Sequence, residues 1–186
     1  MSRIASARFG PTISAVNVRL DRLKVLIVDD NKHTRLLLAQ ILRALGITQT
    51  FEAGDGVEAL AALRNHAVDI VLTDLAMEPM NGIEFVRSLR TGQDSPGPMI
   101  PVIMITGHAT VKRLQEARDA GVNEFMGKPI TARGVIERLA QVVDHARPFI
   151  RTDDYFGPDR RRRSDPSFEG PWRRAGDHRN VRAIEL

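Results

Sequence analysis

The sequence predicts an α/β fold in which a doubly wound, five-stranded parallel sheet carries helices on both faces. Five short runs rich in Val, Ile and Leu alternate with segments whose apolar residues recur at helical spacing. Continuous apolar runs are typical of parallel strands buried on both faces, and alternating strands and helices favour a parallel sheet. The expected strands are residues 24–28, 47–51, 69–74, 101–106 and 124–128.

The helices are predicted from their apolar faces and from the residues at their ends. Asp55 is the expected N-cap of the second helix, and Glu58 three residues later completes a capping box. In that helix Val57, Leu60 and Leu63 are predicted to face the core. The other helices are expected at residues 32–45, 83–90, 110–120 and 131–145.

The composition limits the class of protein. The 186 residues are 42% hydrophobic, which is enough for one globular domain with tails. There is no cysteine, so disulfides and thiol chemistry are excluded. The first residues lack the apolar segment of a secretory signal, and no apolar run approaches the roughly 20 residues that span a bilayer. We therefore expect a cytoplasmic protein without a membrane span.

The net charge of +4 is concentrated at the two ends of the chain. Residues 1–23 carry +3, residues 24–147 carry −1 and residues 148–186 carry +2. We expect residues 1–23 to be a largely mobile lead-in with a short helix near residues 15–23, residues 24–147 to form the domain, and residues 148–186 to form an Arg-rich tail with five aromatic residues. Because the basic excess is absent from the domain, nucleic acid is an unlikely partner.

Polar side chains stand where the predicted strands end. Asp29 and Asp30 follow the first strand, and Asp74 ends the third. Thr106 ends the fourth strand and Lys128 ends the fifth. The carboxyl ends of parallel strands lie at one edge of the sheet, so we expect these side chains to meet in one cleft. Three carboxylates suit Mg²⁺, and a metal with a lysine suits phosphoryl transfer, which depends on positioning and charge neutralisation.

Each of these residues also has an ordinary structural explanation. For Asp29 and Asp30 it is a role as helix N-cap, the usual role of Asp before a helix. Asp74 and Lys128 can be explained as solvated residues of turns, and Thr106 can be explained as the cap of the next helix. All of these explanations must hold at once for the cleft to be absent, so the shared cleft is favoured.

Four short motifs mark the ends of the predicted strands. They are Val28-Asp29-Asp30, Asp74 with Met77 and Gly82 downstream, Ile105-Thr106-Gly107, and Lys128-Pro129. With these motifs in this order, the chain resembles the receiver domain of two-component response regulators over about residues 23–147. The resemblance implies a flavodoxin-like receiver fold with the strand order 2-1-3-4-5.

The resemblance also implies a role for each residue of the cleft. Asp74 is the implied phosphoacceptor, which takes a phosphoryl group from a phosphohistidine on a sensor histidine kinase or phosphotransfer protein. Asp30 and Asp74 are implied to bind Mg²⁺ directly, Asp29 through a water molecule, and Ala76 through its backbone carbonyl. Lys128 is implied to pair with the phosphoryl oxygens.

Two positions form the implied switch. Thr106 would hydrogen-bond the phosphoryl group once it arrives, and Phe125 would turn inward into the vacated space. Phe125 stands where tyrosine is frequent in the family, so this side chain has no hydroxyl to donate. Glu78 stands where proline is usual and Pro79 comes one residue later, which we expect to reshape the loop without removing a ligand.

The resulting hypothesis is a stand-alone response regulator that acts by contact with a protein target. Self-phosphorylation and its slow reversal are the only expected chemistry, so the protein is not expected to be an enzyme. The alternative hypothesis places a ligand site in the tail, where arginines among aromatic residues can clamp phosphates and stack bases. The tail would then bind a cyclic dinucleotide or a nucleic acid independently of phosphorylation. The arginines concerned are Arg160, Arg161, Arg162 and Arg163.

Overall fold

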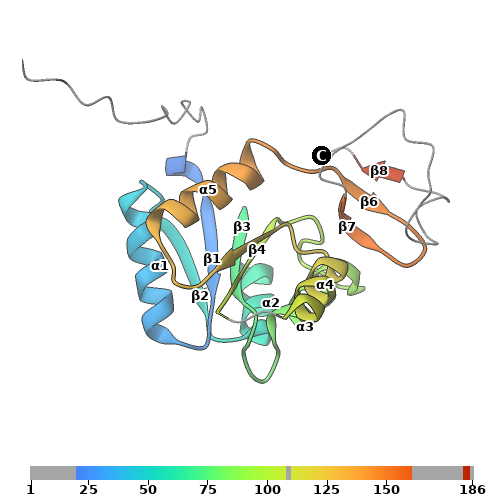
Figure 1. Cartoon of the computed structure of the whole chain (residues 1–186), viewed down its shortest axis with the longest axis horizontal. Coiled ribbons are helices and arrows are strands. Elements are labelled where there is room, and N and C mark those ends of the chain that lie inside the picture. Colours follow the sequence, from blue (N-terminus) through green and yellow to red (C-terminus); the bar gives the residue numbers. More distant parts are fainter. Residues whose placement is uncertain (1–19, 108–109, 161–181, 185–186) are drawn as a thin grey trace, which may run out of the picture.

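The central element of the fold is a five-stranded parallel sheet with the order β2-β1-β3-β4-β5 (Figure 1). The computed structural model describes residues 20–107, 110–160 and 182–184. The strands of this sheet are β1 (Lys24–Val28), β2 (Gln49–Ala53), β3 (Ile70–Asp74), β4 (Val102–Thr106) and β5 (Glu124–Gly127). The predicted fold class and the strand order implied by the family resemblance are therefore both confirmed.

Five α-helices connect and follow these strands, as the sequence predicted. They are α1 (Lys32–Ala44), α2 (Gly56–Asn65), α3 (Gly82–Thr91), α4 (Val111–Ala120) and α5 (Ala132–Val143). A 3-10 turn, η1 (Leu20–Arg22), precedes β1. No helix in the described part of the chain is long and apolar enough to cross a membrane. Of the expected lead-in at residues 1–23, residues 1–19 lie outside the described residues.

The two faces of the sheet hold separate cores, because successive strand residues point to opposite faces. Leu26 and Val28 of β1 pack with residues of α2, α3 and α4 on one face. Val25 and Ile27 pack with residues of α1 and α5 on the other face. This two-sided packing fixes the strands, and it leaves their carboxyl ends free to carry polar side chains.

The start of α2 differs in detail from the sequence prediction. Asp55 is the N-cap, and its side chain accepts from the amide of Val57 at 2.6 Å. The Glu58 carboxylate accepts from the amide of Gly54 at 2.7 Å, one residue earlier than in a standard capping box. The prediction that Val57 faces the core is wrong, because its side chain is half exposed. Ala59 is buried instead. Each residue turns the side-chain direction by about 100° around the helix, so Ala59, two residues after Val57, lies on nearly the opposite face.

A second small sheet follows α5. Strands β6 (Phe149–Arg151) and β7 (Phe156–Pro158) form an antiparallel hairpin, and β8 (Arg182–Ile184) pairs with the other edge of β6. The hairpin lies beside α3 and α4 (Figure 1), and Phe149 and Tyr155 are buried there. The division of the chain at residue 147 stays a prediction, although this first part of the tail packs against the domain. Arg161, Arg162 and Arg163 lie outside the described residues.

Candidate functional site

Three carboxylates meet at the carboxyl edge of the sheet. Asp29 and Asp30 follow β1, and Asp74 ends β3, the neighbouring strand. One oxygen from each of the three lies within 4.8 Å of the others. Asp29 and Asp74 are buried, whereas Asp30 is exposed. The cluster therefore offers hard oxygen ligands together with an open side, which is the kind of site that Mg²⁺ occupies while it keeps some of its waters.

The ammonium of Lys128 joins two of these carboxylates. Its Nζ lies 3.0 Å from Oδ1 of Asp74 and 3.4 Å from Oδ2 of Asp29. Burial raises the pKa of Asp29 and the neighbouring Asp74 adds to this, while the Asn31 amide and Lys128 oppose it. Burial works to lower the pKa of Lys128, but its hydrogen bonds and charge interactions with Asp74 and Asp29 outweigh burial and raise it. Lys128 is therefore held as a cation beside the expected phosphoacceptor.

Backbone amides orient the two buried carboxylates. The amide of Ala76 donates to Oδ2 of Asp74 at 3.2 Å, and the amide of Asn31 donates to Oδ1 of Asp29 at 2.8 Å. Helix α3 begins directly against the end of β3 at Gly82, where a Cβ would collide with the backbone carbonyl of Asp74. Glycine is thus required at this close approach, which gives a physical reason for Gly82 in the motif that follows Asp74.

Thr106 and Lys128 are joined through the backbone of neighbouring strands. The amide of Lys128 donates to the carbonyl of Thr106 at 2.8 Å, and Thr106 pairs with Gly127 in the β4–β5 register. Phe125 lies two residues earlier on β5, where it is partly buried against the core that contains α4. The two expected switch residues therefore stand on adjacent strands.

The ordinary structural explanation of the acidic pair is not borne out. The N-cap of α1 is Asn31, whose side chain accepts from the amides of His33 and Thr34. Asp29 instead points its carboxylate at Lys128. In the same way Thr110, not Thr106, caps α4. Asp29 and Thr106 therefore do not serve as helix N-caps.

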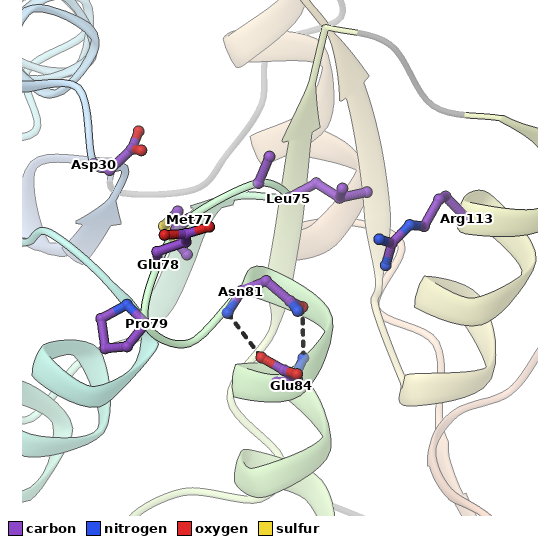
Figure 2. Close-up of a pocket in the computed structure, with 9 residues that line it drawn as sticks. Asp30, Leu75, Met77, Glu78, Pro79, Asn81, Glu84 and Arg113 are labelled. Carbon is purple, nitrogen blue, oxygen red and sulfur yellow. Dashed lines mark hydrogen bonds between the residues drawn. The ribbon is translucent and has the colours of Figure 1, made fainter.

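Two arginines near the site were not anticipated. Arg35 of α1 donates to the carbonyl of Asp29 at 2.8 Å and to the Glu52 carboxylate at 2.9 Å, so it ties β1 to β2. Arg113 of α4 lines an open pocket of about 670 Å³ that begins beside the cluster at Asp30 and Ala76 (Figure 2). Sequence patterns gave no signal for either residue, because both look like ordinary cations on the surface of a helix.

A comparison with protein families identifies the class of protein. The family model of the response regulator receiver domain matches residues 25–140. This match contains the cluster of three aspartates and the lysine that joins them. The chain therefore belongs to the response regulator receiver domain family.

Relatives in this family include chemotaxis proteins. Identity to the chemotaxis protein CheY of Pseudomonas aeruginosa is 38% over 122 residues, covering 66% of this chain and 97% of that protein. The chemotaxis protein CheY-3 of Vibrio cholerae shows 38% identity over 122 residues, covering 66% of this chain and 92% of that protein. The sensor histidine kinase RcsC of Salmonella typhi is 33% identical over 137 residues, which is 74% of this chain but 14% of the kinase.

Solved structures show the same fold. The CheY4 protein of Vibrio cholerae has a TM-score of 0.60 at 30% identity, with coverage of 65% of this chain and 98% of that chain. A CheY-like receiver protein of Methanospirillum hungatei has a TM-score of 0.59 at 27% identity, covering 66% of this chain and 95% of that chain. The matched regions cover almost all of each of these two proteins but leave about a third of this chain without a counterpart.

Proposed function

We propose that the protein is a single-domain response regulator of a phosphorelay, switched by Mg²⁺-dependent phosphorylation of Asp74. The observation that carries this proposal is the position of the Lys128 ammonium, 3.0 Å from Asp74 and 3.4 Å from Asp29, within a cluster of three carboxylates. A carboxylate beside a fixed cation and a metal site has what phosphoryl transfer needs, which is positioning and charge neutralisation.

The cleft residues divide the work of the transfer. Asp30 and Asp74 would hold Mg²⁺ directly, Asp29 would hold it through water, and the carbonyl of Ala76 would complete the protein ligands. When bound, the metal would neutralise charge on the phosphoryl oxygens. An oxygen of Asp74 attacks phosphorus, the bond from phosphorus to the donor nitrogen breaks, and Lys128 pairs with the transferred oxygens.

The output of this step is a change in protein contacts. Thr106 would hydrogen-bond the phosphoryl group and Phe125 would turn inward, so that the surface of α4 and β5 differs between the two states. This is a local charge event that biases a two-state element. The proposed partners are a sensor histidine kinase or phosphotransfer protein and a protein target, and the proposed location is the cytoplasm. No metabolic reaction is proposed.

Phosphorylation is tested by intact mass after incubation with a small phosphodonor and Mg²⁺. We expect one phosphoryl adduct on the wild type, none on Asp74→Asn and none in the presence of a chelator. The matched control is Asp69→Asn, because Asp69 is exposed at the opposite edge of the same sheet. An adduct that persists in Asp74→Asn, or that forms without metal, would contradict the proposal.

The alternative site in the tail receives no support from the described residues. Nη1 of Arg160 lies 2.8 Å from the Asp119 carboxylate, and its guanidinium lies 3.9 Å from the centre of the Tyr155 ring. Arg160 therefore already has an ion pair with Asp119 and a ring contact with Tyr155. A dinucleotide would have to displace both contacts. We do not propose nucleotide or nucleic acid binding for the tail.

A further inference from the structure

The pocket beside the acidic cluster extends from Asp30 to Arg113 of α4. Its floor is the segment from Leu75 to Pro79, which directly follows Asp74, and its far wall is Arg113 (Figure 2). A donor in line with Asp74 must place its leaving group on the side of phosphorus opposite the attacking oxygen. The pocket is large enough, at about 670 Å³, to hold the leaving group of a small phosphodonor.

The charge on the pocket wall is unevenly distributed. Asp30, Glu78 and Glu84 contribute carboxylates, whereas Arg113 is the sole cation among the described residues that line it. Glu84 is engaged in the capping box of α3, where its carboxylate accepts from the amide of Asn81 at 3.1 Å. An anionic donor that enters this pocket therefore meets several negative charges and one positive charge.

Arg113 is able to reach an incoming group. Its side chain is 53% exposed, and its ion pair is a 3.6 Å contact with Glu116 on the same helix. Exposed pairs of this kind contribute less than about 1 kcal/mol, so the contact is readily exchanged for another anion. The guanidinium projects from α4 toward the pocket (Figure 2), and its planar fork suits a carboxylate in bidentate geometry.

We propose that Arg113 is a specificity-determining residue that favours acyl phosphates as phosphodonors of Asp74. Its guanidinium binds the carboxylate that an acyl phosphate releases and stabilises the negative charge that develops on it. In this step the new O–P bond forms at Asp74, the P–O bond to the acyl group breaks, and the electron pair leaves with the carboxylate. No proton is transferred. The inference rests on the proposed phosphorylation of Asp74 and adds a residue that discriminates among small phosphodonors.

A donor with a neutral leaving group provides the contrast. When phosphoramidate reacts, the P–N bond breaks and the protonated nitrogen leaves as neutral ammonia, so no anion develops in the pocket. A phosphohistidine that is protonated on its second ring nitrogen likewise releases a neutral imidazole. Arg113 therefore has no leaving-group charge to stabilise when the donor is a nitrogen compound. Its removal should slow phosphorylation by acyl phosphates without slowing phosphorylation by nitrogen donors.

The test measures second-order rate constants for phosphorylation by acetyl phosphate and by phosphoramidate, with intact mass as the readout. We expect Arg113→Ala to slow the reaction with acetyl phosphate about five- to twentyfold, the range between an exposed ion pair and a charge-assisted hydrogen bond. The rate with phosphoramidate should stay within about twofold of the wild type. Arg113→Lys should restore part of the rate with acetyl phosphate.

The matched control is Lys112→Ala, since Lys112 is the adjacent exposed cation and does not line the pocket. It should leave both rates near those of the wild type. Equal slowing with both donors, no slowing with either, or the same effect from Lys112→Ala would overturn the inference while leaving Asp74 as phosphoacceptor. A wild type that takes phosphate from neither donor overturns the proposed function and the inference together.

Discussion

The guanidinium carbon of Arg90 lies 5.0 Å from the centre of the Phe149 ring, so the end of α3 is covered by the first strand of the tail hairpin. Arg90 is only 3% exposed. Burial lowers its pKa to about 10 and Tyr155 opposes this, so Arg90 is charged at neutral pH. Its hydrogen bonds go to the carbonyls of Pro98, Ile100 and Gly121 and to the side chain of Asn123.

This contact predicts that the hairpin contributes to the stability of the receiver. Phe149→Ala removes a ring that is 2% exposed and opens the buried guanidinium of Arg90 to water. We expect a loss of about 3 kcal/mol or more in the free energy of unfolding, as is usual for Phe→Ala in a core. Urea unfolding of the full chain measures it.

The control for this prediction is Val111→Ala. Val111 is 72% exposed at the start of α4, and its truncation should change stability by less than about 0.5 kcal/mol. If Phe149→Ala changes the unfolding midpoint no more than this control does, the hairpin is not part of the cooperative unit and the prediction is wrong.

The acidic cleft could be predicted because each of its residues stands next to its own strand. A buried apolar run ends, a polar side chain follows, and parallel topology brings the ends to one edge. Asp74 and Lys128 are far apart in sequence, yet both were placed correctly at this edge because the topology does not depend on side-chain detail. Their contact at 3.0 Å is a consequence of the strand order.

The docking of the hairpin could not be predicted, for a different physical reason. Arg90 stands in the last turn of α3, where a basic residue is usual and ordinarily solvated. Its burial depends on Phe149 and Gly121, which no local pattern connects to it. Gly157 also approaches the backbone of Gly121, where a Cβ would lie 3.0 Å from its Cα. Such contacts between distant segments leave no periodic signal in the sequence.

The close approach of α3 to β3 predicts that Gly82→Ala damages the site. The new Cβ would strike the carbonyl of Asp74, which is backbone and cannot swing aside. We expect a loss of about 1–3 kcal/mol in stability, typical of overpacking, together with slower phosphorylation of Asp74. Thermal unfolding and intact mass after phosphodonor treatment measure the two effects.

Gly127→Ala is the matched control, because a Cβ at Gly127 meets nothing within 4 Å although the residue is next to Lys128. This variant should phosphorylate at a rate close to that of the wild type. An equal loss in both variants would show that the effect comes from glycine replacement in general and not from the contact with Asp74.

The buried phenol of Tyr155 predicts a dependence of stability on alkaline pH. Burial raises its pKa to about 12, against the opposing charges of Arg160, Arg90 and Arg147. The folded state therefore keeps the proton more tightly than the unfolded chain, which loses it near pH 10. The stabilising contribution is full below pH 10 and falls by up to about 1.4 kcal/mol per pH unit between pH 10 and 12.

Comparison of the wild type with Tyr155→Phe isolates this effect. At pH 8 the variant should be less stable by about 1 kcal/mol, because it loses the hydrogen bond from the Tyr155 hydroxyl to the carbonyl of Pro158 at 2.8 Å. The difference should shrink and then reverse as the pH rises from 10 to 11.5 in urea unfolding experiments. A difference that stays constant with pH would contradict the prediction.

Metal binding is expected to stabilise the protein through the acidic cluster. Asp29, Asp30 and Asp74 have ligand oxygens within 4.8 Å of one another, and a cation relieves the repulsion between them. Mg²⁺ at one hundred times its Kd should add about 2.7 kcal/mol to the free energy of unfolding, and a chelator should remove the gain.

The variant Asp30→Asn should lose most of this gain in stability, because Asp30 is the exposed member that completes the ligand set. The variant Asp69→Asn should keep the gain. An equal gain in Asp30→Asn and the wild type would place the metal elsewhere and would remove the support for Asp74 as a Mg²⁺-dependent phosphoacceptor.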